Sequence, residues 1–305
     1  MNEPADALYV QYKSLLFALA YRMTGSAAEA EDVVQDVFVQ WSRRAPEARE
    51  LEHPKAYLCR MTVNRCTDLA RSARARRETY FGPWLPEPLV AVEADPAARA
   101  ERDETLSFAM LLLMEKLRPI ERAVFVLREA FGFEYDEIAG MVEKSETNVR
   151  KIMSRVRAKL EAERPDLSDA PPPSAAFGFA AELLDAFHRA ANGGGLEPLM
   201  QRLAPDVVLV SDGGGKAFAA AVPIHSRSRV AAFLGGLLRR AAEEPARYAV
   251  VPAAVNGGPG LAVLEDGAVR NVMTFEFGAD GTAKHIYIIR NPDKLRHVSE
   301  ALRIP

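Results

Sequence analysis

Two proline-rich stretches interrupt this chain of 305 residues, and they constrain its fold more than any other feature. The first is Gly82-Pro83-Trp84-Leu85-Pro86-Glu87-Pro88, and the second runs from residue 164 to residue 173. Proline lacks a backbone N–H and has a fixed φ, so neither stretch continues a helix or a central strand. We therefore expect segments at 1–78, 97–164 and 175–305, joined by linkers at 79–96 and 165–174. A chain of this length also exceeds what one hydrophobic core usually organises.

The first two long segments have the apolar spacing of helices. An apolar stripe recurs at three- and four-residue intervals, made of Val33, Val34, Val37, Phe38 and Trp41. Ser26 precedes this stripe as a candidate N-cap. Pro54 stands where the first turn of a further helix is expected. Both segments are therefore predicted to be all-α domains.

The third segment changes character along its length. Helical patterns at about 176–190 and 228–241 precede β-rich runs at 207–210, 248–255, 261–264, 269–277 and 285–289. Asp280-Gly281 lies between the last two runs and is typical of a hairpin turn. An α+β domain is the expected fold of residues 175–305.

The charge of the chain is nearly balanced, with 39 Lys and Arg against 42 Asp and Glu, for a net charge of −3. This total argues against a uniformly basic nucleic-acid binder. Positive charge is nevertheless concentrated at 60–77 and at 144–159, and each of these stretches holds six basic residues and one acid. Two such clusters suit two contacts along one DNA molecule, although a single cluster is commonly only a solvated helical face.

The remaining composition predicts a cytoplasmic protein without a metal centre. The first residues lack the basic and apolar regions of a signal peptide, and no apolar run approaches the roughly 20 residues of a membrane span. Cys59 and Cys66 are the only cysteines, and neither lies in a cluster of metal ligands. We expect two buried thiols in a reducing compartment.

Residues 134–160 have the pattern of a helix-turn-helix. Its buried positions hold apolar residues, with the small Ala139 at the helix crossing and Ser145 as a cap of the second helix. Glu143 stands in the turn where glycine is common. The second helix would enter the major groove with an exposed face made of Asn148, Arg150, Lys151, Ser154 and Arg155. The alternative is an ordinary helical hairpin with a solvated basic face.

These segments resemble a known family. Ala30-Glu31-Asp32-Val33-Val34-Gln35-Asp36-Val37-Phe38 and the run from Pro54 to Arg71 resemble region 2 of extracytoplasmic-function sigma factors, and residues 117–160 resemble region 4. The resemblance implies binding to core RNA polymerase, through its β′ clamp and β flap, and to promoter DNA. Region 2 would contact polymerase through Asp32, Gln35 and Asp36. It would bind the −10 element through Arg60, Asn64, Arg71 and Arg74, and region 4 would read the −35 element with the face named above.

Three further motifs resemble the sigma-factor group with a SnoaL-like C-terminal extension, a cone-shaped α+β sheet domain. They are the run from Tyr80 to Pro88, Asp212-Gly213-Gly214-Gly215-Lys216 and Asn291-Pro292-Asp293-Lys294-Leu295. In that group the extension is thought to regulate the sigma core in cis. The resemblance implies contacts between domains by both C-terminal motifs and by Trp84, Leu85 and Pro86. Trp84 and Leu85 are large and apolar, so they need a surface against which to be buried.

Two other functions stay open from the residues. SnoaL-like folds host isomerases and cyclases, and candidate polar groups are Asp212, His225, Glu276, His285 and Tyr287. Their spacing defines no catalytic dyad, and a fold alone does not transfer an activity, so we expect neither catalytic residues nor a cofactor. A small-molecule effector in this domain is compatible with the sequence. The second alternative is a DNA-binding regulator that acts without polymerase.

Overall fold

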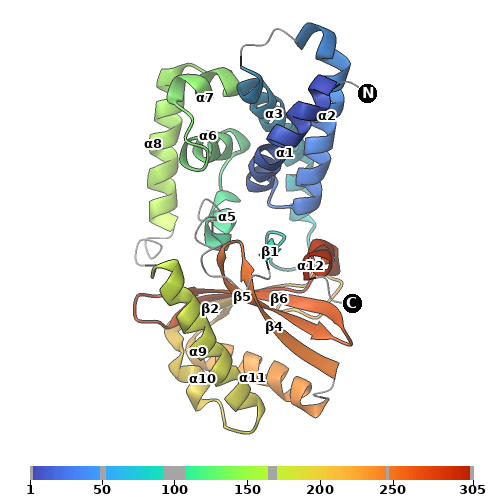
Figure 1. Ribbon diagram of the computed structural model, residues 1–305. Coiled ribbons are helices and arrows are strands. Elements are labelled where there is room, and N and C mark those ends of the chain that lie inside the picture. Colours follow the sequence, from blue (N-terminus) through green and yellow to red (C-terminus); the bar gives the residue numbers. More distant parts are fainter. Residues whose placement is uncertain (1–2, 49–52, 92–106, 164–169, 245–246, 303–305) are drawn as a thin grey trace. The chain divides into compact units, whose positions relative to one another are not determined.

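The structure is a computed structural model that describes residues 3–48, 53–91, 107–163, 170–244 and 247–302 (Figure 1). The chain forms two compact units. Residues 1–79 and 110–164 make up the first, and residues 80–109 and 165–305 make up the second. The expected segment boundary at residue 97 lies outside the described residues.

The first unit begins with three long helices, α1 (Glu3–Thr24), α2 (Ala27–Ala48) and α3 (Pro54–Glu78). The Ser26 hydroxyl accepts a hydrogen bond from the Glu29 backbone N–H at 3.1 Å, which confirms Ser26 as the cap of α2. The expected apolar stripe is buried, with Val33 0% and Trp41 4% exposed.

The first unit continues with α6 (Pro119–Glu129), α7 (Tyr135–Val142) and α8 (Glu146–Glu163), after the short apolar helix α5 (Phe108–Met114). Ile138 of α7 and Val149 of α8 are fully buried, as the helix-turn-helix pattern predicts. Glu143 ends α7 in the left-handed region, with φ 53° and ψ 49°. A residue with a Cβ is strained in that conformation, which glycine adopts freely. The turn therefore holds Glu143 at some cost in stability.

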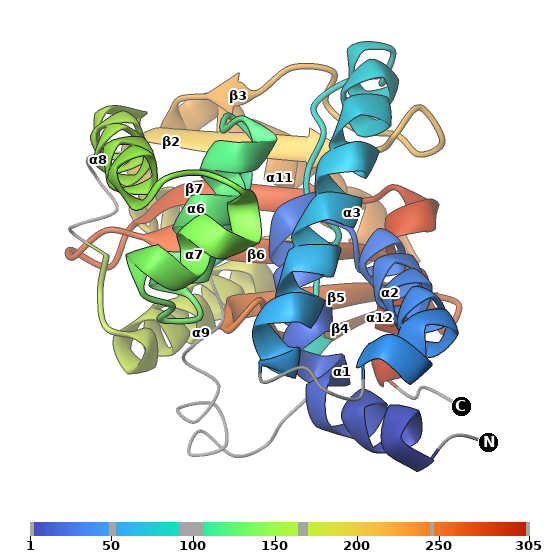
Figure 2. The same ribbon diagram turned by 90° about the horizontal axis from the view of Figure 1, so that it is seen from above.

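Within the described residues, the second unit is built on a mixed sheet of seven strands that does not close into a barrel. The strands are β1 (Val90–Ala91), β2 (Leu203–Asp212), β3 (Ile224–His225), β4 (Tyr248–Val255), β5 (Gly258–Glu265), β6 (Ala268–Phe277) and β7 (Ala283–Ile289). Their order across the sheet is β1-β4-β5-β6-β7-β2-β3, which Figure 2 shows from β4 to β3. β2 and β7 pair in parallel, and the other neighbours pair antiparallel.

Helices cover this sheet. Figure 1 shows α9 (Pro173–Ala191), α10 (Glu197–Gln201) and α11 (Arg227–Glu243) on one face. Leu209, Phe275 and Ile288 point into the resulting core, together with Leu183 of α9 and Leu234 of α11. The 3₁₀ turn η3 (Pro292–Lys294) and α12 (Arg296–Leu302) follow β7. None of the described helices is both long and apolar enough to cross a membrane.

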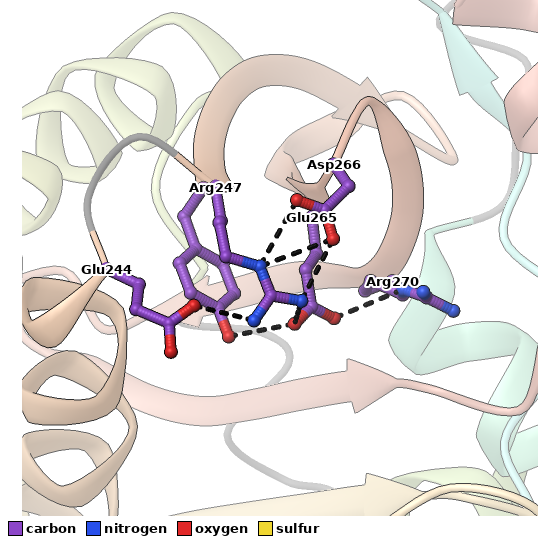
Figure 3. A network of polar contacts seen from close by, with 6 residues as sticks. Glu244, Arg247, Glu265, Asp266 and Arg270 are labelled. Atoms are coloured by element: carbon purple, nitrogen blue, oxygen red, sulfur yellow. Dashed lines mark hydrogen bonds and ion pairs between the residues drawn. The ribbon is translucent and has the colours of Figure 1, made fainter.

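A polar network fixes the turn between β5 and β6 (Figure 3). The Arg247 guanidinium lies 2.9 Å from the Asp266 carboxylate, 3.1 Å from Glu265 and 2.6 Å from Glu244. The Asp266 backbone N–H also donates to the Arg247 carbonyl at 2.8 Å. Arg247, Glu244 and Asp266 are substantially exposed and only Glu265 is half-buried, so the network sets the register of the turn more than it adds stability.

Candidate nucleic-acid interface and linker-binding site

The outer face of α8 carries the residues that the sequence predicts for DNA contact. Arg150, Lys151, Ser154 and Arg155 are exposed, and Asn148 is half-buried. The Ser145 hydroxyl accepts a hydrogen bond from the Asn148 backbone N–H at 3.3 Å, so Ser145 caps this helix as expected. The structure therefore brings the whole predicted set together on one helical face.

A second polar surface lies on α2 and α3. A cavity of about 320 Å³ is lined by Gln40, Tyr57, Arg60, Met61, Asn64, Arg65 and Asp68. Two residues predicted to bind the −10 element, Arg60 and Asn64, thus share one cavity. The side chains of Arg71 and Arg74, predicted for the same contact, lie outside the described residues.

The helix-turn-helix contacts the helix that carries this cavity. The Arg60 guanidinium lies 2.5 Å from the Glu143 carboxylate, and the Lys55 ammonium lies 4.7 Å from the centre of the Phe133 ring. Arg122 of α6 is 5% exposed and donates from Nε to the Arg22 carbonyl of α1 at 2.7 Å. Burial lowers the pKa of Arg122 to about 10. Sequence reasoning did not single out Arg122, because an arginine inside an apolar helix gives no signal of its own.

The residues predicted to contact polymerase lie on α2 but are not equivalent. Asp32 and Gln35 are exposed. Asp36 is half-buried, and its carboxylate accepts from Arg65 Nε of α3 at 2.9 Å. Asp36 therefore helps to hold α2 against α3, whereas Asp32 and Gln35 present their polar groups to solvent.

The proline-rich segment after α3 is bound to the C-terminal sheet domain through Asp212. This carboxylate, at the end of β2, is fully buried. It accepts hydrogen bonds from the Tyr80 hydroxyl at 2.6 Å and from the Leu85 backbone N–H at 2.9 Å. Burial, followed by the hydrogen bond to Asp212, raises the pKa of Tyr80. Leu85 itself is fully buried, which confirms that it needs a covering surface.

Lys294 completes this site from the second C-terminal motif. Its ammonium lies 2.7 Å from the Asp212 carboxylate, donates to the Leu85 carbonyl and lies 4.1 Å from the centre of the Trp84 ring. The side chain is only 8% exposed. A buried charge requires a partner and hydrogen bonds; Asp212 supplies the ion pair, and the linker supplies the Leu85 carbonyl and the Trp84 ring. Asn291 contributes as well, since its side-chain amide donates to the Tyr80 hydroxyl at 2.8 Å.

The glycines of the first C-terminal motif let the chain approach closely. Gly214 and Gly215 have φ values of 57° and 71°. A Cβ on Gly214 would lie 2.3 Å from the Asn291 side chain and 2.8 Å from the Tyr80 hydroxyl. Lys216 of the same motif forms an exposed ion pair with Asp293 at 2.5 Å.

The linker is also bound as a strand at the edge of the sheet. β1 pairs antiparallel with β4, with Val90 opposite Val255. Just before it, the backbone of Leu89 donates to the Asn256 side chain at 3.2 Å and accepts from the Asn256 backbone N–H at 2.8 Å. Sequence reasoning missed Asn256. Its signal was the Asn256-Gly257 pair, a strong hairpin dipeptide.

The candidates for an enzymatic site do not face the helix-covered interior. Asp212, Tyr287 and Glu276 alternate with residues of that core along their strands, so they lie on the opposite face of the sheet. His285 lies on that face too, with its Nδ1 3.3 Å from Glu276, and His225 is exposed on β3. Asp212 is occupied by the linker. Among the described residues, no group of three or more His, Cys, Asp or Glu is arranged to hold a metal ion.

Comparison with known proteins agrees with this architecture. Residues 8–76 match the Sigma-70 region 2 family, and residues 107–160 match Sigma-70, region 4. The chain is 35% identical to the ECF RNA polymerase sigma factor SigJ of Mycobacterium tuberculosis over 227 residues, which are 74% of this chain and 70% of that protein. It is 31% identical to the probable ECF RNA polymerase sigma factor SigI of the same species over 208 residues, 68% and 69% of the two chains.

A solved structure resembles the chain over nearly its whole length. The crystal structure of M. tuberculosis SigJ matches with a TM-score of 0.72 and 28% identity, covering 95% of this chain and 97% of that one. The match includes the SnoaL-like sheet domain as well as both helical regions. The chain therefore belongs to the extracytoplasmic-function sigma factors, the subunits that act with core RNA polymerase at promoter DNA.

Proposed function

We propose that the C-terminal domain of this sigma factor regulates it in cis by holding the linker between regions 2 and 4. The observation that carries this proposal is the buried contact of Asp212 and Lys294 with Tyr80 and Leu85. Linker residues that are bound to the sheet domain cannot stretch out between regions 2 and 4. Because a chain spans at most about 3.3–3.6 Å per residue, docking of residues 80–91 fixes a segment that could otherwise extend to at most about 40 Å between the two DNA-reading regions.

The helical regions have separate tasks in this proposal. The α8 face reads the −35 element as duplex, where guanidinium groups pair with guanine and with phosphates. The cavity beside Asn64 and Arg60 holds an unstacked base of the −10 element, and the basic residues around it attract the strand. Asp32 and Gln35 contact the β′ clamp, and region 4 contacts the β flap.

The alternatives have less support. A regulator independent of polymerase would not need region 2. Enzymatic activity of the C-terminal domain would need polar groups that converge in its interior, and the candidate residues lie on the other face of the sheet. We therefore infer that this domain acts by binding the linker rather than by catalysis.

Binding to core polymerase and run-off transcription test the proposal. The full chain should co-purify with core polymerase and direct specific initiation, and it should bind duplex DNA only weakly by itself. Truncation after residue 165 should change the transcript yield, because it removes the surface that holds the linker. Unchanged transcription after truncation would remove the regulatory role and leave the sigma activity in place.

A further inference from the structure

Tyr135 occupies an unusual position in the helix-turn-helix. It is the first residue of α7, and two guanidinium groups lie over its ring. The Arg150 Cζ atom of α8 is 4.3 Å from the ring centre, and the Arg128 Cζ atom of α6 is 4.8 Å from it. One aromatic ring thus contacts side chains from both neighbouring helices.

Arg150 is also held by an ion pair along one edge of its guanidinium. Glu146, one turn earlier on α8, accepts from Arg150 Nε at 2.9 Å and lies 2.7 Å from Nη2. The Nη1 group has no partner among the described residues. The edge formed by Nη1 and Nη2 therefore points away from Glu146, and it is the edge that can form two parallel hydrogen bonds to guanine.

The platform under Arg150 is itself anchored. Arg128 donates to the Phe133 carbonyl at 2.8 Å and lies 3.0 Å from the Glu134 carboxylate, so its guanidinium is held against the Tyr135 ring. Arg150, in contrast, remains 58% exposed. An exposed cation–π contact adds little stability, so its main consequence is to restrict the orientations of a long, flexible side chain.

We propose that Tyr135 is a positioning residue for −35 recognition, which holds Arg150 ready to read one base pair of the promoter. This inference rests on the proposed role of the α8 face. Tyr135 lies outside the recognition helix, so it acts through Arg150. Glu146 has the same role through the Nε and Nη2 edge of Arg150, and it also offsets the charge of Arg150, which favours a directed base contact over general attraction to phosphates.

Selection from a library of duplexes with a randomised −35 element tests this role, with holoenzyme assembled from each variant. R150A should abolish the base preference at one position. Y135L should weaken the preference at that same position about three- to tenfold, whereas Y135F, which keeps the ring, should stay within about twofold of the parent. R155A is the matched control, because Arg155 lies on the same face without contacting Tyr135. R155A identifies the base-pair position that Arg155 reads, and the base preference at that position should be unchanged in Y135L.

The double variant Y135L/R150A separates the possible outcomes. If Tyr135 acts through Arg150, the double variant should behave like R150A alone. Additive losses, or an equal loss at every position in Y135L, would overturn the inference. A parent-like preference in R150A would instead refute the proposed base contact of Arg150, and the inference with it. If Y135L folds poorly, E146Q provides a second test, because it should weaken the base preference at the position that Arg150 reads. An unchanged base preference in E146Q would contradict the proposal that these neighbours position Arg150.

Discussion

The buried pair of Asp212 and Lys294 predicts a large and selective loss of linker binding when Lys294 is replaced by Met. K294M keeps most of the side-chain volume but removes the ammonium. The fully buried Asp212 carboxylate then retains only the hydrogen bonds from Tyr80 and Leu85 among those described above. Removing one partner of a buried pair typically costs about 3–5 kcal/mol. We take the lower end because two donors remain, and about 3 kcal/mol weakens docking roughly hundredfold.

Trp84 provides a direct reporter of docking. The chain has two tryptophans, and Trp41 is buried in the region 2 core. In a W41F background, release of the linker should shift Trp84 emission to the red and increase its quenching by acrylamide. Lys216→Met is the matched control, because Lys216 pairs with Asp293 in an exposed position, where an ion pair contributes about 0–1 kcal/mol.

The comparison of the two lysines decides the outcome. We expect K216M to keep the Trp84 emission and quenching of the parent. K294M should show red-shifted Trp84 emission and stronger quenching, while its sheet domain stays folded. If K294M and K216M give the same Trp84 signal as the parent, the buried pair does not hold the linker, and the reasoning from burial is wrong.

Three further predictions follow from particular residues. In urea unfolding, E143G should have a free energy of unfolding about 1 kcal/mol higher than E143A, because both lose the ion pair to Arg60 and only glycine relieves the left-handed strain. Equal stability would show that residue 143 is unstrained. Burial raises the pKa of the Cys59 and Cys66 thiols to about 12. Native protein should therefore react slowly with thiol reagents at pH 8, and fast labelling would contradict this burial. Because the folded pKa exceeds the ordinary value of 9.0, the stability from these neutral thiols should be complete below pH 9 and decline above it, which a C59A/C66A variant should not show.

The sequence anticipated the parts of the molecule that rest on local patterns. The exposed α8 face follows from helical periodicity around Val149, and the left-handed turn at Glu143 follows from the spacing of the helix-turn-helix. The need of Leu85 for a covering surface was also visible, because a large apolar residue in a proline-rich run cannot remain solvated without cost.

Long-range pairings were beyond reach. Nothing local indicates that Val90 joins the edge of β4, or that β2 pairs in parallel with β7, because both depend on partners more than 70 residues away. The partners of Tyr80 and Asn256 were also beyond reach, although both residues lie in recognisable motifs, because those partners depend on what the folded sheet brings beside them. The face of the sheet on which Asp212 lies also required the strand register, since alternation alone does not say which side the helices cover.

The dependence of transcription on promoter spacing tests the central claim most directly. Run-off transcription would use a selected promoter whose −35 and −10 elements are moved apart or together one base pair at a time. If the held linker sets the reach between regions 2 and 4, the parent and K216M should share a narrow spacing optimum, and K294M should transcribe from a wider range of spacings. Identical spacing profiles for all three proteins would contradict the account.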